Sequence, residues 1–437
     1  MRSTSSTLAW IAFGACMCAG WPAAAEPLKD ELRGLLISHP DILAAEKTAG
    51  SSRESIKQVE AEYLPRVTLN ADTGNQRLDN PSTRGSGNSP YSRGRDSATL
   101  TITQNLFNGF STTSGVQIAE LNAEVARMTM EGTRQNTLLE GIRAYLTVQR
   151  QRRLIELATS NEENIQTQLN LEDERVQSGA GVAVDVLQAK SRLQIAKERL
   201  VSFEGDLEDA ISRYVRLFDH APNLDTMNDP PVPADLIPDS LERAIDMALN
   251  DNPAIINSAT NVAVAREQKE RLRSEYMPTV DLVGKWNLEK NVDAVVGVKR
   301  DYQVLLQASW SLFSGLTTAS KNTQAAYDLG AKKDTQDITE RRVIEQARVS
   351  WQALTTARQR VELLENAVNI ASEVFDARQK LREAGKETVI NVLDAENEIF
   401  AARINFVQAS YDEQVAIYQL LLAMGQLSAN LLGIDEG

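Results

Sequence analysis

The chain has very little cysteine or histidine. Its only cysteines are Cys16 and Cys18, and its only histidines are His39 and His220. The histidines follow no metal-ligand spacing and no cysteine cluster accompanies them, so we predict no metal site and no cofactor. The many carboxylate pairs follow the i, i+4 spacing of a solvated helix surface and do not indicate a general acid and base. We therefore predict no catalytic residue and no enzymatic activity.

Long apolar runs and an excess of positive charge are also missing. We interpret residues 1–25 as a cleaved secretory signal peptide, because Arg2, a short apolar core and the small residues Ala23–Ala25 follow one another. Lipidation of Cys16 or Cys18 within this segment is left open. Beyond residue 25 no stretch reaches ~18 uninterrupted apolar residues, so we expect no transmembrane helix. The 60 acidic residues exceed the 46 basic ones, which argues against nucleic acid as a partner.

Proline is missing from residues 91–221 and 279–437, which permits long helices in both stretches. Five of the thirteen prolines fall instead in residues 221–238, which we predict to be a connector. In the first proline-free stretch, apolar residues recur at alternating spacings of 4 and 3, the 3.5-residue period of a helix packed lengthwise in a coiled coil. This seam consists of Val182, Val186, Ala189, Leu193, Ala196, Leu200, Phe203, Leu207, Ala210, Tyr214 and Leu217.

The sequence contains the same unit twice. Tyr63-Leu64-Pro65 is matched 213 residues later by Tyr276-Met277-Pro278, and Asn105–Gly109 is matched 206 residues later by Ser311–Gly315. Such internal similarity predicts two structural repeats. The predicted first repeat, at 26–220, has helices, strands at about 66–75 and 96–107 and a long helical hairpin at 112–217. The connector follows at 221–238. The predicted second repeat, at 239–437, has helices, strands at about 279–289 and 300–313 and a long helical hairpin at 316–425.

The four strands are predicted from alternation of apolar and polar residues with period 2. Between the first two, residues 76–95 are rich in Ser, Gly and Arg and predict a mobile exposed loop. Strands of about 10 residues suit an outer membrane, with Trp286, Tyr302 and Trp310 as an interfacial aromatic girdle. Four strands cannot close, and lipid tolerates no open sheet edge. We therefore expect three copies to complete a 12-stranded barrel.

These features resemble the TolC family of outer membrane channel-tunnels. The resemblance rests on the duplicated unit, on the Leu-Phe-x-Gly motifs ending at Gly109 and Gly315, and on the hairpin-tip motifs that begin at Gly179 and Gly385. It implies a mainly α fold with a β-barrel portion, in which a trimeric 12-stranded barrel in the outer membrane continues into a long α-helical coiled-coil periplasmic tunnel. Residues 392–398 are most similar to the outer membrane channels of type I protein secretion.

The resemblance also implies partners. A homotrimer in outer membrane lipid would work with a periplasmic adaptor protein and an inner-membrane ABC transporter, and would export protein cargo. One alternative is the outer membrane channel of a proton-driven multidrug efflux pump. A second, from a different class, is a soluble periplasmic coiled-coil adaptor, although that class carries one hairpin and this chain predicts two.

Residues for two sites follow from the hairpin tips. Glu387, Asn391, Asp394 and Glu398 are spaced 4, 3 and 4, so they share one helix face, which in a trimer would line the periplasmic aperture together with Asp185. The family tends to place Arg at 387 and Asp at 391, so this chain lacks the usual arginine, and Arg382 or Lys386 is a candidate partner for Asp185. The residues predicted to dock the adaptor are Gly179, Ala180, Gly181, Val182, Gly385 and Lys386.

Overall fold

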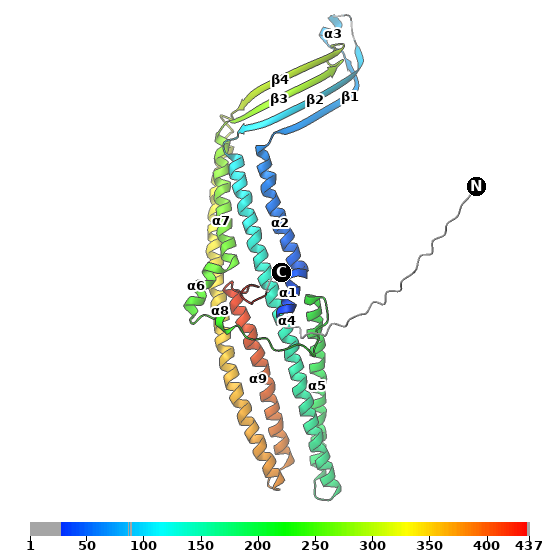
Figure 1. Cartoon of the computed structure of the whole chain (residues 1–437), viewed down its shortest axis with the longest axis vertical. Helices are drawn as coiled ribbons and strands as arrows, with labels where there is room; N and C mark the ends of the chain where they lie inside the picture. Colours follow the sequence, from blue (N-terminus) through cyan, green and yellow to red (C-terminus); the bar gives the residue numbers. More distant parts are fainter. Residues whose placement is uncertain (1–27, 86, 88–89, 435–437) are drawn as a thin grey trace, which may run out of the picture.

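The structure, a computed structural model, describes residues 28–434 except 86, 88 and 89. The predicted signal peptide, with Cys16 and Cys18, lies outside the described residues. The molecule is long and narrow: a β-sheet forms one end, helices run along its length, and two helical hairpin turns form the opposite end (Figure 1).

Two helical hairpins make up most of the molecule. In the first, α4 (Ser111–Gln177) is followed by α5 (Ala183–Phe218), and in the second α8 (Thr317–Glu383) is followed by α9 (Val389–Ala423). α4 and α8 have 67 residues each, which corresponds to ~100 Å at ~1.5 Å per residue. Ten of the eleven seam residues lie in α5 and seven of these are buried, so the 4-3 seam is its packed face. None of the described helices is apolar enough over a sufficient length to cross a membrane.

Shorter helices extend the two hairpins toward the sheet. α2 (Pro40–Glu60) lies along α4 beyond the end of α5, and α7 (Pro253–Arg271) lies along α8 beyond the end of α9 (Figure 1). Both begin with a proline at the first turn, where a missing N–H costs nothing. Both are also capped by the preceding side chain, since His39 accepts from the Asp41 N–H (3.3 Å) and Asn252 accepts from the Ala254 N–H (2.9 Å). α1 (Leu28–Ser38) and α6 (Leu241–Asp251) precede them.

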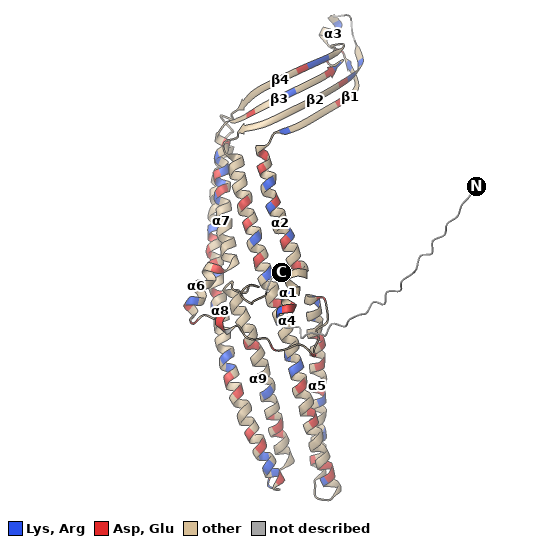
Figure 2. Cartoon of the chain, in the orientation of Figure 1, with Lys and Arg blue, Asp and Glu red and all other residues tan. Residues whose placement is uncertain are grey.

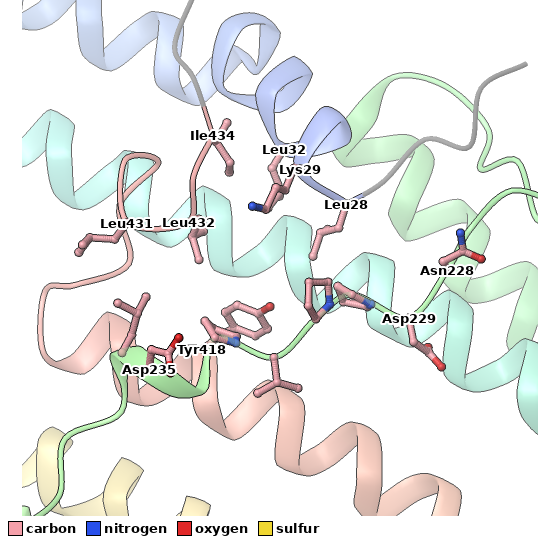
Figure 3. Close-up of a pocket in the computed structure, with 15 residues that line it drawn as sticks. Leu28, Lys29, Leu32, Asn228, Asp229, Asp235, Tyr418, Leu431, Leu432 and Ile434 are labelled. Atoms are coloured by element: carbon pink, nitrogen blue, oxygen red, sulfur yellow. The ribbon is translucent and has the colours of Figure 1, made fainter.

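The largest apolar core forms a belt halfway along the molecule, where α1, α4, α5 and α9 meet. Its fully buried side chains include Leu35, Ile142, Tyr145 and Leu420. The proline-rich connector crosses this belt, and a cavity of about 480 Å³ remains between it, α1 and the segment after α9 (Figure 3). Tyr418 of α9 lines this cavity, and burial raises the pKa of its phenol to about 12. Because α1, α4 and α5 belong to the first repeat and α9 belongs to the second, the belt joins the two repeats.

Four antiparallel strands form one sheet in the order β1-β2-β3-β4. They are β1 (Arg66–Leu78), β2 (Tyr91–Phe107), β3 (Thr279–Lys290) and β4 (Val298–Ser309). β2 pairs with β3, so the sheet, like the belt, joins the two repeats. Charged residues of both signs are spread over the helices, whereas the middle of the sheet carries few (Figure 2).

Two of the predicted segments differ from the structure. Residues 76–95 are not simply a loop, because β1 and β2 remain paired out to Leu78 and Tyr91, and the short helix α3 (Pro81–Gly85) lies between them. Polar side chains line both faces there, so no apolar alternation marks the strands. The fourth strand ends at Ser309 and not at residue 313, because its partner β3 begins at Thr279, directly after a proline that has no N–H for the ladder.

Candidate channel and aperture site

The sheet has one apolar face and one polar face. Trp286 of β3 lies opposite Tyr302 of β4 and Leu100 of β2, so the apolar residues of neighbouring strands lie on the same face of the sheet. The residues that share the apolar face include Val67, Leu69, Ala71, Ala98, Leu100, Ile102, Leu282, Trp286, Leu288, Tyr302, Val304, Leu306 and Ala308. Val304 and Leu306 are 79% and 69% exposed. An exposed apolar face of this extent requires an apolar partner or lipid.

The predicted girdle residues lie at two levels of the sheet. Trp286 and Tyr302 are cross-strand neighbours. Trp310 follows the end of β4, and its indole N–H donates to the carbonyl of Tyr276 (3.1 Å). Eight residues separate Tyr302 from Trp310, or ~26 Å at ~3.3 Å per residue. At the ~35–45° tilt of barrel strands this is ~20 Å along the membrane normal, somewhat less than the ~25 Å height of an apolar band flanked by aromatic girdles.

The two hairpin tips have the same backbone geometry. Gly179 (φ 78°) ends α4 and Gly385 (φ 71°) ends α8, and in each turn the next residue, Ala180 or Lys386, donates its N–H back to a carbonyl of the helix (2.9 Å). The positive φ angles favour glycine. Val182, in the first turn, is 60% exposed although it begins the apolar seam. The predicted docking residues therefore form two small exposed turns at one end of the molecule.

The predicted aperture residues of the second hairpin lie at the start of α9, with Glu387 just before the helix, and three of them have defined partners. Glu387 accepts hydrogen bonds from the Asn391 side chain and from the Thr388 N–H (3.0 Å). These bonds, that from Asn391 first, hold the pKa of Glu387 below its ordinary value. Asp394 accepts from Arg192 of α5 (2.6 Å), so the first and second hairpins are joined by an ion pair at this level.

The other predicted aperture acids are not joined to this group. Asp185 stands at the start of α5 and Glu398 lies exposed on α9. The idea that Arg382 pairs with Asp185 is wrong within this chain, because the Arg382 guanidinium is occupied by Glu172 of α4, whose two carboxylate oxygens it reaches at 3.0 Å each. No ion pair of Lys386 is present among the described residues.

Glu172 is a functional candidate that the sequence reasoning missed. Its side chain is 2% exposed, and it accepts from Arg382 across the hairpins and from Arg175 one turn away on its own helix (2.9 Å). Arg382 also donates to the carbonyl of Glu387 (3.0 Å). The available signal was its spacing: Glu172 follows Leu169 by three residues and precedes Val176 by four, so a carboxylate occupies a position of the apolar seam.

Glu396 is a second buried acid that occupies a seam position. It is 4% exposed, and neither carboxylate oxygen has a hydrogen-bond partner among the described residues. Burial raises the pKa of Glu396 to about 7. It follows Val392 by four residues and precedes Ile399 by three, so its spacing also indicates a carboxylate at a position of an apolar seam. Within the described ranges, no group of three or more His, Cys, Asp or Glu side chains is placed to hold a metal ion.

The sequence matches a known family, described as outer membrane efflux protein, over residues 32–216 and 244–426. The chain belongs to the outer membrane efflux protein family. This membership confirms the resemblance read from the repeats and tip motifs, places the protein in the outer membrane with a large periplasmic portion, and confirms that it is a channel protein and not an enzyme. It excludes the alternative of a soluble adaptor.

Individual relatives differ in the transport that their names describe. The outer membrane efflux protein BepC of Brucella suis biovar 1 (strain 1330) is 27% identical over 80% of this chain and 78% of its own length. The alkaline protease secretion protein AprF of Pseudomonas aeruginosa is 25% identical over 90% of this chain and 83% of its own. The solved structure of the outer-membrane channel OprN, 18% identical, superposes with a TM-score of 0.78 over 91% of this chain and 89% of its own, which confirms the predicted fold class.

Proposed function

We propose that this channel is the outer membrane exit duct of a type I secretion system, driven by an inner-membrane ABC transporter through a periplasmic adaptor, and that it exports protein cargo. The observation that carries the proposal is the similarity to a protease secretion protein over 90% of the chain. The sequence of α9 from Val392 to Glu398, at the level of the ion pairs between the hairpins, supports the same assignment.

The duct is a homotrimer in outer membrane lipid. Within one chain, β1 and β4 are the edges of the sheet, and an unpaired edge in lipid would leave N–H and C=O groups without partners. Three copies pair edge to edge into 12 strands, with the apolar face toward lipid and the polar face toward a lumen. The aromatic side chains Trp286, Tyr302 and Trp310 then lie at the two interfaces.

The hairpin tips form the periplasmic end of the duct. Threefold symmetry brings Asp185, Glu387, Asn391, Asp394 and Glu398 of each chain around the axis, where their carboxylates favour cations. The ion pairs between the two hairpins of a chain hold this end narrow. The exposed tip turns, with Gly179 to Val182 in one and Gly385 and Lys386 in the other, accept the adaptor, since small residues allow a partner helix to approach closely.

Complementation tests the assignment. The chain is expressed in a bacterium whose own type I channel has been deleted, together with the matching transporter and adaptor, and both secreted protein and resistance to small toxic compounds are measured. Restored secretion of the protein is the expected result. Restored resistance without secretion would overturn the proposal in favour of a proton-driven multidrug efflux pump, which the similarity to the efflux protein BepC supports as the second candidate.

A further inference from the structure

A cavity of about 200 Å³ lies between the two hairpins, above their tips. α4 borders it on one side, and α8 and α9 border it on the other. Glu396 is eleven residues from Gly385, so the cavity lies ~16 Å from the tip turn at ~1.5 Å per residue. It is separate from the ion pairs of Glu172 and Asp394, and the aperture residues do not line it.

Two buried polar side chains, one from each hairpin, line this cavity. Glu396 of α9 is 96% buried and Asn161 of α4 is 92% buried, because their exposed fractions are 4% and 8%. Both line the cavity, and neither carboxylate oxygen of Glu396 has a hydrogen-bond partner among the described residues. A carboxylate buried in this way costs several kcal/mol unless it is neutralised. Native buried polar groups without a protein partner therefore point to a bound water or ion.

The remaining lining supplies oxygen atoms. Ser160 and Asn164 of α4 and Ser372 and Asp376 of α8 surround the two buried side chains. Hydroxyl, amide and carboxylate oxygens are the ligands of hard cations such as Mg²⁺ and Ca²⁺. No sulfur or imidazole lines the cavity, so the donor set does not suit softer transition metals.

Size and charge decide between possible occupants. A drug-sized ligand needs a pocket of ~300–1,000 Å³, which exceeds this cavity. At ~30 Å³ per water, about seven waters fill it. Mg²⁺ typically keeps several waters and is held through one or two carboxylates. This cavity offers two, the buried Glu396 and the exposed Asp376. Arg403 also lines the cavity and is exposed, and among the described residues it forms no ion pair with Glu396.

We propose that this cavity binds a hydrated divalent cation, Mg²⁺ or Ca²⁺, between Glu396 and Asp376 of the second hairpin and Asn161 of the first. The cation joins the two hairpins of one chain. With few protein ligands and retained water, its affinity falls in the weak range of extracellular sites, ~0.1–1 mM. This inference stands whether the exported cargo is a protein or a drug.

Calorimetric titration of the purified, detergent-solubilised trimer tests the proposal. After treatment with EDTA and its removal, MgCl₂ or CaCl₂ is titrated at pH 8, where protons compete least. We expect one saturable site per chain. Glu396→Gln keeps the shape of the side chain and should weaken binding at least tenfold, and Asn161→Ala should weaken it several-fold. Glu373→Gln removes an exposed carboxylate of α8 that does not line the cavity, and should leave the affinity unchanged.

Three results would overturn the proposal. The first is the lack of saturable binding of either cation by the wild-type trimer, and the second is unchanged binding in Glu396→Gln. The third is equal weakening in Glu396→Gln and Glu373→Gln, which would indicate general attraction to an acidic surface. If Glu396→Gln does not assemble, Asn161→Ala decides alone, since it removes a neutral ligand. Size-exclusion chromatography of each variant verifies that the trimer is intact.

Discussion

Removal of Arg382 should separate the two hairpins at the periplasmic end. Arg382→Ala takes away two of the three charged hydrogen bonds that reach Glu172, a carboxylate with 2% exposure. Breaking a fully buried pair costs ~3–5 kcal/mol. Because Arg175 remains beside Glu172 and Arg382 is itself 24% exposed, we take roughly half of that, about 2 kcal/mol. Since 1.4 kcal/mol is about tenfold, the balance between joined and separated hairpins should shift ~30-fold.

Single-channel recording in planar bilayers measures this shift, because a wider periplasmic end conducts more ions. Arg382→Ala should raise the conductance or the fraction of time spent in a high-conductance state. Arg175→Ala is a matched control: it removes an arginine from the same carboxylate, but one that lies on the same helix and does not cross between hairpins. Equal conductance of Arg382→Ala and wild type, or an equal rise in both variants, would refute the reasoning that the cross-hairpin bond holds the aperture.

Three other substitutions test other parts of the molecule. Val304→Lys places a charge on the exposed apolar face of β4, which should cost ~2–4 kcal/mol in lipid. The band of folded trimer should then disappear from heat-modifiability gels. Gln303→Lys, on the opposite face, should be tolerated. Gly385→Trp should block export while trimers persist. Gly385→Ala, which has the same positive-φ strain without the bulk, should retain export. Loss of export in both variants would mean that the glycine serves only the turn. With divalent cations chelated, Glu396 has a folded-state pKa of about 7 against an ordinary 4.5. The free energy of unfolding should therefore fall by ~1.4 kcal/mol per pH unit as pH rises between these two values. A Glu396→Gln variant that shows the same pH dependence in thermal unfolding would contradict this.

The sequence predicted the fold class because the periods of its elements are unbroken. The 4-3 seam of α5 needs no tertiary information, since one stripe of the helix is apolar and the rest is polar. The same holds for the strands over the part of the sheet whose faces differ in polarity. The method failed between residues 76 and 95, where β1 and β2 continue as a ribbon with polar side chains on both faces. A strand without an apolar face has no periodic signal, and only the backbone pairing, as at Leu78 and Tyr91, reveals it.

The candidate site was harder to predict because its partners come from different hairpins. Spacing placed Glu387, Asn391, Asp394 and Glu398 on one helix face, and the structure places them on successive turns near the tip. Spacing could not indicate that Arg192 reaches Asp394, because the two residues are 202 positions apart and charged residues are common on both helices. A charge that belongs to a pair is indistinguishable from a solvated charge until the packing of the helices is known.

The two acids in apolar seams suggest why the hairpins are joined by polar contacts near the tip. Apolar packing there is limited to a small cluster in which Val389 and Leu393 of α9 contact α4 and α5. A seam filled entirely with leucine would join the hairpins more strongly, but burial of apolar area is non-directional and changes little with salt or with a charged partner. A carboxylate at 172 or 396 instead makes the junction depend on an arginine or on a neutralising ion. Such a junction is stable when its partner is present and weakens when a competing charge removes it, as the proposed opening at the periplasmic end requires.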